Sequence, residues 1–318
     1  MDFSPTQVAI IGFVVLFVLM LLRVPVGMAM GLVGVCGFGY LSGWGPALKL
    51  IGQTSMRTVT DYNFGVIPMF MLMGALVTVS GMSRELFRVA NAMIGHLRGG
   101  LGVATILACG GFAAVCGSSV ATAATFSTVA YPEMRRFNYP QSFSTGVIAA
   151  GGTLGIIIPP STVLAVYAIL TQQDIGKLFI AGVIPGLLAL LMYILTISVI
   201  VWARPHLLPA GENKSWSERL SSLKEVWGPL TLFVFVMVGL YAGLFTPTEA
   251  GGVGAAGAFL IGWARGKLGK PEILEALLSA TRTSAAVFTV LIGALIFGYF
   301  LTITQVPQNV TEFLTNLG

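Results

Sequence analysis

Long apolar runs separated by short polar connections dominate this chain. A helix that crosses a bilayer needs roughly 20 predominantly apolar residues, and several runs approach that length. They lie near Val8–Leu22, Val24–Leu41, Phe64–Ser80, Leu178–Trp202, Pro229–Phe245, Ala250–Trp263 and Ala285–Thr302. The pattern therefore predicts an all-α fold with several membrane-spanning helices.

Two other stretches are more polar. Pro46–Asp61 carries Lys49 and Arg57 between apolar positions, which predicts an arm-like helix at the membrane interface. Arg204–Val226 is the most polar part of the chain, and its second half is amphipathic. We expect it to be a linker that lies on the membrane surface.

Composition supports a membrane location. Of the 318 residues, 56% are hydrophobic and only 9% are charged, whereas a soluble domain carries about a quarter charged residues. The net charge of +5 does not indicate nucleic-acid binding, because the basic residues are scattered at the ends of apolar runs. The N-terminal MDFSPTQ lacks the features of a signal peptide, so the first run is expected to stay as a helix in the lipid bilayer.

The basic residues also predict orientation. Thirteen of the 17 Lys and Arg residues fall into four connections, which the positive-inside rule places in the cytoplasm. These are Arg84, Arg88 and Arg98; Arg135 and Arg136; Arg204, Lys214, Arg219 and Lys224; and Arg265, Lys267, Lys270 and Arg282. The segment between the first two connections must therefore leave the cytoplasm and return to it.

That segment, Gly99–Met134, has about 36 residues, which is too short for two full spans. It fits a re-entrant hairpin with limbs of roughly 15 residues, or about 23 Å each. The tip falls at Cys116–Ser119, where glycine and serines interrupt the apolar pattern. Because non-helical backbone is tolerated at membrane depth only inside protein or along a cavity, we expect this tip to face a site.

A second interruption follows in Gln141–Leu170. Gly151, Gly152 and Gly155 precede Pro159-Pro160-Ser161. Prolines cannot donate backbone hydrogen bonds, so the carbonyls of the preceding turn lose their usual partners. The sequence predicts two half-helices joined by an unwound elbow.

The chain also weakly resembles itself. Arg23-Val24-Pro25 opens a glycine-rich helix, and Gly74 of a Gly-Ala-Leu motif follows that proline by about 49 residues. Phe245-Thr246-Pro247 opens another, and Gly293 of a second Gly-Ala-Leu follows by about 46. The charge pattern starts the two halves on opposite sides of the membrane, and inverted repeats with broken helices are typical of secondary transporters.

The same spacing predicts that the second repeat is incomplete. Gly117 follows Gly74 by about 43 residues, and this offset from Gly293 falls near position 336, beyond Gly318.

The two interruptions contain no ionised side chain. No Asp, Glu, Lys or Arg lies in the hairpin before Glu133 or between Gln141 and Leu170. A proton-driven carrier usually needs a titratable group in the membrane, whereas carbonyls and hydroxyls can hold sodium. Carbonyls at the end of the first limb suit this cation, and the free N–H groups of the second limb suit a carboxylate. The alternative role of the hydroxyls here is helix packing or hydrogen bonding to the preceding turn.

Other chemistry is disfavoured. Cys36, Cys109 and Cys116 lie in apolar segments without CxxC spacing, which indicates packing and no disulfide or metal site. His96 and His206 are single residues in polar connections. No organic cofactor is expected, and no membrane base is available to activate a serine for catalysis.

Three motifs carry a family resemblance. "CGSSVATAAT", "GGTLGIIIPPS" and "TPTEAG" occur in this order, and together they resemble the large membrane subunit of tripartite ATP-independent periplasmic (TRAP) transporters. The resemblance implies an elevator-type, sodium-driven importer of organic acids in the bacterial inner membrane. It implies two partners, a periplasmic substrate-binding protein and a small membrane subunit. The resemblance also implies a second hairpin and a second elbow, which we expect to be missing from these 318 residues.

The resemblance also implies site residues. Sodium contacts are expected at Gly117, Ser118, Ser119, Gly155, Pro159 and Pro160. Substrate contacts are expected at Ser118, Ser119, Thr122 and Ser161, and we add Arg57, the one arginine placed on the outer side. Sialic acid, C4-dicarboxylates and 2-oxo acids all stay open as substrates.

These observations divide the chain into segments. They are scaffold helices and an arm at 1–61, a helix and cytoplasmic connection at 62–98, hairpin and broken helix at 99–175, scaffold helix and linker at 176–226, and the start of a second repeat at 227–318. The alternative function is an inactive truncated or scaffold subunit that needs a partner to complete the second half. We expect no sodium-driven uptake by these 318 residues, even with a binding protein and a small membrane subunit, until a second hairpin segment is restored.

Overall fold

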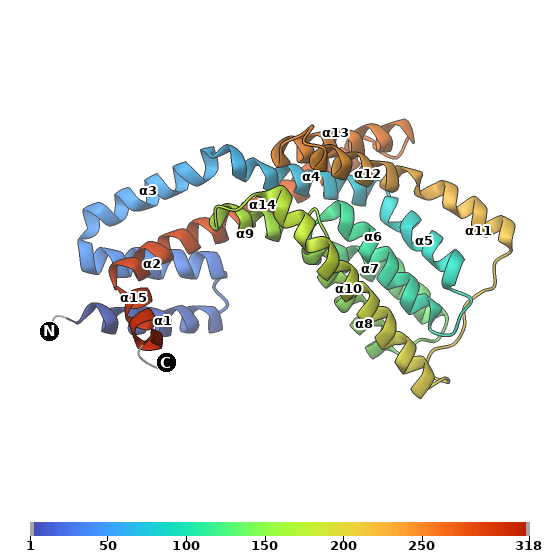
Figure 1. The fold of residues 1–318 in the computed structure, drawn as a ribbon, viewed down its shortest axis with the longest axis horizontal. Coiled ribbons are helices and arrows are strands. Elements are labelled where there is room, and N and C mark those ends of the chain that lie inside the picture. The colour runs from blue at the N-terminus through green and yellow to red at the C-terminus, as the bar shows by residue number, and fades with distance from the viewer. Residues whose placement is uncertain (1–2, 316–318) are drawn as a thin grey trace. The chain divides into compact units, whose positions relative to one another are not determined.

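The computed structural model describes residues 3–315 and is almost entirely helical (Figure 1). Helices make up 83% of it, and within this range no β-strand occurs. The all-α class expected from the apolar pattern is confirmed.

The helices follow the predicted apolar runs closely. Their bounds are α1 Pro5–Leu21, α2 Val26–Ser42, α3 Trp44–Thr60, η1 Tyr62–Gly65, α4 Val66–Val79, α5 Met82–Ile94, α6 Gly100–Cys116, α7 Ser119–Arg136, α8 Gln141–Ile157, α9 Thr162–Leu170, α10 Ile175–Ala203, α11 Trp216–Leu223, η2 Lys224–Val226, α12 Trp227–Tyr241, α13 Pro247–Ala264, α14 Lys270–Ile303 and α15 Val306–Thr315.

Two differences from the sequence prediction concern charged residues. The connection that holds Arg84 and Arg88 is largely a helix, α5, which is amphipathic and buries Phe87 and Glu85. The span expected at Ala285–Thr302 belongs to a longer helix that begins at Lys270. The sequence prediction missed both features because an apolar run ends at the first charged residue, whereas a helix can continue through charged residues.

Helix length and composition identify the candidate spans. Within the described part of the chain four helical segments are long and apolar enough to cross a membrane: Tyr62–Val79, Ile175–Ala203, Trp216–Tyr241 and Lys270–Ile303. The pair α8 and α9, bent by 41°, adds a fifth if it is one broken span. Three further apolar helices, α1, α2 and α6, have 17 residues each.

The chain forms two compact units. Unit 1 comprises Met1–Asp61 and Arg282–Gly318, and unit 2 comprises Tyr62–Thr281. In unit 1 the α2 helix packs against α14 through glycines: a Cβ at Gly27 would lie 2.7 Å from the backbone of Val290, and one at Gly34 would lie 2.8 Å from that of Phe297. Phe13 meets Phe297 edge to face, with 5.5 Å between ring centroids.

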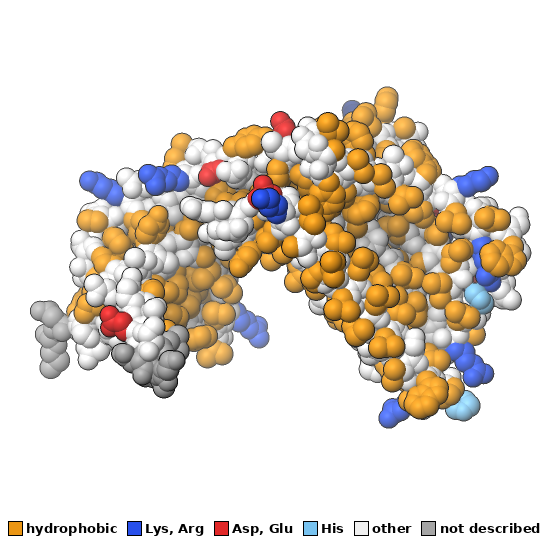
Figure 2. All heavy atoms as spheres, viewed as in Figure 1, with side chains coloured by type: hydrophobic (Ala, Val, Ile, Leu, Met, Phe, Trp, Pro, Cys, Tyr) orange, Lys and Arg blue, Asp and Glu red, His pale blue; other side chains and the backbone are white. Residues whose placement is uncertain are grey.

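Unit 2 is built around the hairpin. The first limb, α6, is its most buried helix, and α7 and α8 pack against it and each other. Farther out, α10 exposes a continuous apolar side that includes Ile184, Leu188 and Leu191. Figure 2 shows hydrophobic side chains over the α8 and α10 region, with Lys, Arg and His side chains at the end where α10 stops. An exposed apolar surface of this extent fits contact with lipid.

The internal resemblance corresponds to a helix pairing that occurs in both units. In unit 1, α2 packs on α14, where Gly31 lies opposite Gly293. In unit 2, α13 packs on α4, where a Cβ at Gly251 would lie 2.8 Å from Met69 Cβ and one at Gly254 would meet Met73. In each case a proline-opened, glycine-rich helix packs on a Gly-Ala-Leu helix from the other half of the sequence.

Candidate functional site

The hairpin tip forms where glycine allows a left-handed turn. Gly117 has φ 63°, a conformation that glycine adopts at little cost, and its N–H donates to Ala113 O at 3.0 Å to close α6. Ser118 then caps α7, and its Oγ accepts from Ala121 N at 3.4 Å. Phe112 and Phe126 contact each other across the limbs, with 5.8 Å between centroids. The predicted hairpin, with its tip at Cys116–Ser119, is therefore present.

The elbow forms where two prolines end α8. Pro159 and Pro160, joined by a cis peptide bond, have no N–H for Gly155 O and Ile156 O one turn earlier. Ser161 replaces one of these donors: its Oγ donates to Ile156 O at 2.7 Å and accepts from Leu164 N at 3.3 Å, which begins α9. The two predicted half-helices are thus present.

Tip and elbow meet directly. The backbone N–H and the Oγ1 of Thr162 both donate to Gly117 O, at 3.3 and 2.9 Å. A Cβ at Gly155 would lie 2.6 Å from Ser118 O, so only glycine permits this approach. We call this arrangement of Gly117–Thr122 and Gly155–Thr162 the tip–elbow cluster. It brings together every predicted site residue except Arg57.

Thr162 is a contact residue that the sequence analysis missed. The sequence feature that could have identified Thr162 is a hydroxyl residue at the first position of a half-helix, directly after Pro-Pro-Ser. The contact with Gly117, 45 residues away, exists only in the folded chain.

Most predicted hydroxyls have structural hydrogen bonds. Thr122 Oγ1 donates to Ser118 O at 2.7 Å, and both Ser118 and Ser161 act as helix caps. The Thr122 hydrogen bond is the bond to the preceding turn that was weighed against ligand binding, whereas the helix-capping role of the two serines was not foreseen. Ser119 is half-buried, and in the region the structure covers its Oγ makes no hydrogen bond. It is therefore the predicted hydroxyl that is free to contact a ligand.

The cluster has electrostatic character without charged residues. The C-terminal ends of α6 and α8 and the N-terminal ends of α7 and α9 converge here. Helix C-termini carry partial negative charge and N-termini partial positive charge. Gly117 O and Ser118 O already accept two protein hydrogen bonds each, whereas Gly155 O lacks its usual helical donor. The arrangement can hold a cation beside an anion.

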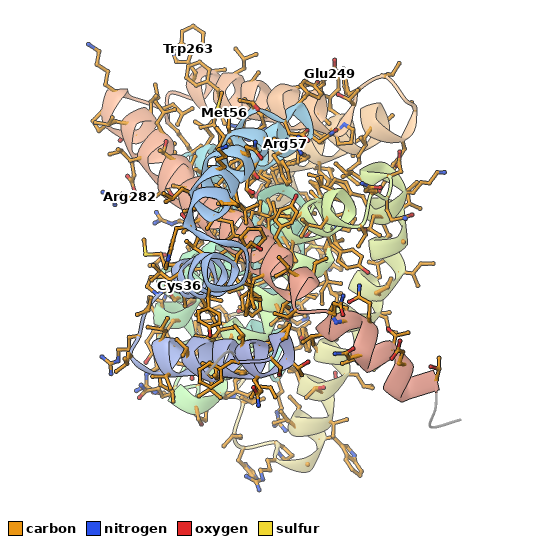
Figure 3. The ribbon with its side chains drawn as sticks, turned by 90° about the vertical axis from the view of Figure 1, so that its left-hand side faces the viewer. Cys36, Met56, Arg57, Glu249, Trp263 and Arg282 are labelled. Carbon is orange, nitrogen blue, oxygen red and sulfur yellow. The ribbon has the colours of Figure 1, made fainter. Side chains whose placement is uncertain are left out.

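Arg57 belongs to unit 1, whereas the tip–elbow cluster lies in unit 2. It is an exposed residue in the last turn of α3 (Figure 3). Its role as a substrate contact stays a prediction.

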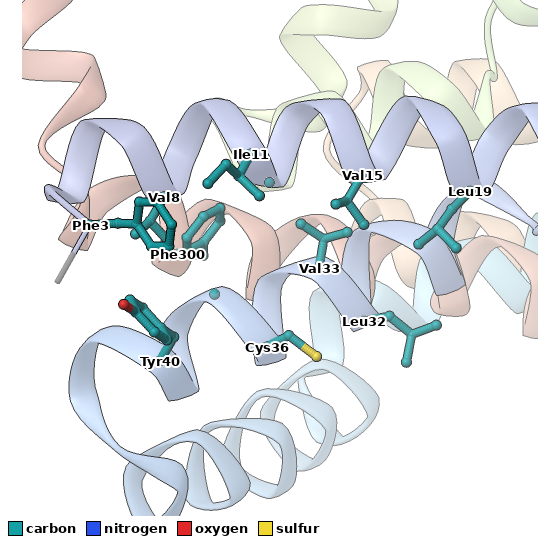
Figure 4. A pocket seen from close by; sticks show the side chains of 12 residues that line it. Phe3, Val8, Ile11, Val15, Leu19, Leu32, Val33, Cys36, Tyr40 and Phe300 are labelled. Carbon is teal, nitrogen blue, oxygen red and sulfur yellow. The ribbon is translucent and has the colours of Figure 1, made fainter. Parts of the chain in front are cut away.

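Unit 1 has a cavity of about 480 Å³, but its lining is apolar (Figure 4). Phe3, Val8, Leu32 and Phe300 line it, and the phenol of Tyr40 is its main polar group. An organic acid would lose its hydration there without gaining hydrogen bonds, so this cavity does not suit such a substrate.

Unit 2 has a second polar region, where the basic connections meet. Arg136 pairs with Glu212 at 3.1 Å, and Tyr139 Oη donates to Pro209 O at 2.9 Å. Arg88 pairs with Glu225 at 3.2 Å. The connections predicted to share the cytoplasm therefore contact one another.

A buried carboxylate organises this region. Glu85, in α5, accepts from Arg265 Nη1 at 2.7 Å and from Lys267 Nζ. The Arg265 guanidinium also lies over the Trp227 ring, 4.7 Å from its centroid. We call Glu85, Arg265 and Lys267 the ion cluster. The sequence analysis placed its basic members in cytoplasmic connections but gave Glu85 no role.

Comparison with known proteins settles the family. The family described as "Tripartite ATP-independent periplasmic transporter, DctM component" matches residues 13–318. This chain belongs to that family. The resemblance seen in the three motifs is confirmed.

Curated relatives agree. The C4-dicarboxylate TRAP transporter large permease protein DctM of Pseudomonas aeruginosa is 42% identical over 264 residues, which are 82% of this chain and 61% of that protein. The protein of the same name from Rhodobacter capsulatus is 35% identical over 326 residues, 98% of this chain and 73% of the relative. The sialic acid TRAP transporter large permease protein SiaM of Vibrio cholerae is 29% identical over 273 residues, 85% of this chain and 63% of the relative.

Family and fold together establish a helical integral membrane protein of the TRAP large-permease type. The relatives are named as transporter permeases and not as enzymes, which agrees with the absence of a catalytic base predicted from the sequence.

Proposed function

We propose that this chain is the large membrane subunit of a sodium-driven importer of a small organic acid in the bacterial inner membrane. The supporting observation is the tip–elbow cluster, where four helix ends converge without a charged side chain. Broken helices whose ends point at one locus are the usual way for a secondary transporter to hold ions and anionic substrates.

Sodium binds in this proposal to backbone oxygens of Gly155, Pro159 and Pro160, helped by Ser119. The predicted ligands Gly117 O and Ser118 O already accept two hydrogen bonds each, so these two residues position the tip beside the ion. Gly155 O is the strongest candidate, because Pro159 removes its helical donor. The substrate carboxylate binds near Ser119 at the N-terminal end of α7, where helix N–H groups favour an anion. Ser118, Thr122 and Ser161 hold the backbone that forms both positions.

The transport cycle moves the tip–elbow cluster between the two sides of the membrane in an elevator-type motion. The repeated pairing of α2 with α14 and of α13 with α4 supports an inverted-repeat architecture, on which such motions are built. A periplasmic binding protein delivers the acid, and a small membrane subunit braces this one. One relative, from Oleidesulfovibrio alaskensis, is named "Isethionate TRAP transporter permease protein DctMQ".

C4-dicarboxylates are the first substrates to test, because relatives with that name match at 34–42% identity. The experiment is uptake of labelled succinate into proteoliposomes that contain this chain extended by a second hairpin segment, a small membrane subunit and a periplasmic binding protein, because no uptake is expected from these 318 residues without that segment. We expect uptake with external sodium and none with potassium. Uptake driven equally by a proton gradient would contradict sodium coupling.

A pair of serine variants on α7 locates the site. Ser119→Ala removes the free hydroxyl of the cluster, and about a tenfold loss of apparent sodium affinity is expected if it is a ligand. Ser127→Ala is the matched control, because Ser127 is exposed on the same helix and its Oγ donates only to Ala124 O. Equal sodium dependence in both variants would move the site away from the hairpin tip.

A further inference from the structure

A polar cavity of about 570 Å³ opens in unit 2 beside the ion cluster. It lies between the end of α4, the start of α5 and the connection from α13 to α14. Arg84, Arg88 and Lys267 line it, together with one carboxylate, Glu272. The proposed transport site is elsewhere, so this cavity needs an explanation of its own.

Two of the three carboxylates around the cavity are paired with cations, and the third, Glu272, accepts from the backbone at the start of α14. Glu85 binds Arg265 and Lys267, Glu225 pairs with Arg88, and Glu272 Oε2 accepts from Gly269 N at 2.9 Å. Arg84 is exposed and forms no ion pair with any residue that the structure describes. An uncompensated guanidinium therefore lines the cavity.

The backbone adds to this positive field. Gly81 lines the cavity and begins α5 in a left-handed conformation, with φ 75° and no side-chain cap. The N–H groups of Arg84 and Glu85 already donate to Gly81 O, so the donors left in this first turn are those of Met82 and Ser83. The helix dipole favours an anion at this end. Arginine and helix N–H groups together suit the oxygens of a phosphate.

Tryptophans indicate the depth of the cavity in the membrane. Trp263, at the end of α13, is 64% exposed and projects from the helix (Figure 3), and Trp227, at the start of α12, is 50% exposed. Exposed tryptophans gather at the level of lipid headgroups, where the ring is in contact with both lipid and water. Arg265 stacks on Trp227 and binds Glu85, so the cavity lies at that level too.

We infer that this cavity binds the phosphate of an anionic phospholipid headgroup. Arg84 and Arg88 hold the phosphate oxygens, and the α5 N-terminus contributes backbone donors. A lipid fits better than a soluble anion because the tryptophans place the cavity at headgroup depth, and basic pockets between membrane helices are suited to anionic headgroups. This inference does not depend on the transported substrate.

The test is lipid retention by the purified protein. It is reconstituted in nanodiscs of phosphatidylglycerol and phosphatidylcholine, released, and analysed by native mass spectrometry. We expect phosphatidylglycerol to stay bound to the original protein, and Arg84→Gln with Arg88→Gln to lower its occupancy about tenfold, which is typical for the loss of charge-assisted hydrogen bonds.

Arg204→Gln is the matched control, because Arg204 is an exposed arginine at the end of α10 and does not line the cavity. It should retain the lipid. Arg84→Gln alone is a second variant that keeps the Arg88–Glu225 pair, so its loss of lipid cannot be attributed to a broken ion pair.

A parallel measurement separates a lipid from a free anion. Phosphatidylglycerol should raise the unfolding temperature of the original protein, and the Arg84→Gln protein should respond less. Stabilisation by inorganic phosphate alone that equals the lipid effect would overturn the lipid assignment. Equal lipid retention by the cavity variants and by Arg204→Gln would overturn the site itself.

Discussion

The tip–elbow cluster and the ion cluster both connect helix ends that are far apart in the sequence, but they do so with different chemical groups. At the tip, Thr162 donates to Gly117 O through neutral groups, and the surrounding residues from Gly117 to Thr122 carry no charge. In the ion cluster, one carboxylate, Glu85, binds two cations.

Access to water explains why one cluster uses neutral groups and the other uses charged side chains. An ionised side chain in an apolar environment loses hydration that neutral groups do not need, so a cluster packed among apolar helices is more easily stabilised by backbone dipoles and hydroxyls. Lys267 is 41% exposed at its side chain, so the ion cluster keeps contact with solvent. Charged side chains join the helix ends in the ion cluster, whereas close backbone contact joins them in the tip–elbow cluster.

The largest expected effect tests that close contact. Gly155→Ala places a Cβ 2.6 Å from Ser118 O, which is backbone and cannot rotate away. We expect the free energy of unfolding to fall by about 3 kcal/mol, as for an overpacked core. Gly146→Ala is the control on the same helix, because a Cβ there meets nothing within 4 Å. Equal stability of the two variants in denaturant titrations would show that the tip–elbow contact is loose.

The next effect concerns the ion cluster. Glu85→Gln leaves Arg265, whose side chain is only 14% exposed, with a guanidinium that no longer faces a charge. Breaking a buried ion pair costs roughly 3–5 kcal/mol, and we expect about 2 kcal/mol here because Lys267 can turn to water.

Glu218→Gln is its control, because Glu218 is exposed and a glutamine keeps the capping box with Ser215. Thermal unfolding in detergent should separate the two variants. A similar small loss in both would mean that the ion cluster adds little stability.

A smaller effect is expected from the hydrogen bond that joins tip and elbow. Thr162→Val removes the Oγ1 donor to Gly117 O but keeps the side-chain shape and the backbone donor. The loss should be about 1.5 kcal/mol, because a buried carbonyl loses one of its partners. Thr145→Val, whose exposed hydroxyl bonds to Gln141 O in α8, should change little. A larger loss of stability in Thr145→Val than in Thr162→Val would show that the hydrogen bond from Thr162 to Gly117 O contributes little to the tip–elbow contact.

The smallest expected effect lies at the base of the hairpin. Tyr139→Phe loses the hydrogen bond to Pro209 O, worth about 1 kcal/mol at neutral pH. Burial raises the pKa of Tyr139 to about 12, above its ordinary value near 10.

A raised folded-state pKa adds stability that is complete below pH about 10 and is lost as the pH rises towards 12. The original protein should therefore lose stability over that window relative to Tyr139→Phe. If the stability of the two proteins changed with pH in the same way, the hydroxyl of Tyr139 would not be buried.

The sequence by itself determined the all-α class, the core of four candidate spans and both interruptions, for local physical reasons. Gly117 permits a left-handed turn, and Pro159 and Pro160 remove backbone donors, whatever surrounds them. Apolar runs reveal spans because lipid excludes unpaired polar groups. Sequence motifs also identified the family, since three of them occur in the right order.

Only the tertiary structure decided which groups meet. Thr162 and Gly117 are 45 residues apart, and Glu85 lies 180 residues from Arg265. Such pairs leave no local pattern, because the contact depends on how the helices pack and not on the residues beside each partner. For the same reason Ser118 and Ser161 look like free hydroxyls in the sequence, whereas in the fold they cap α7 and α9.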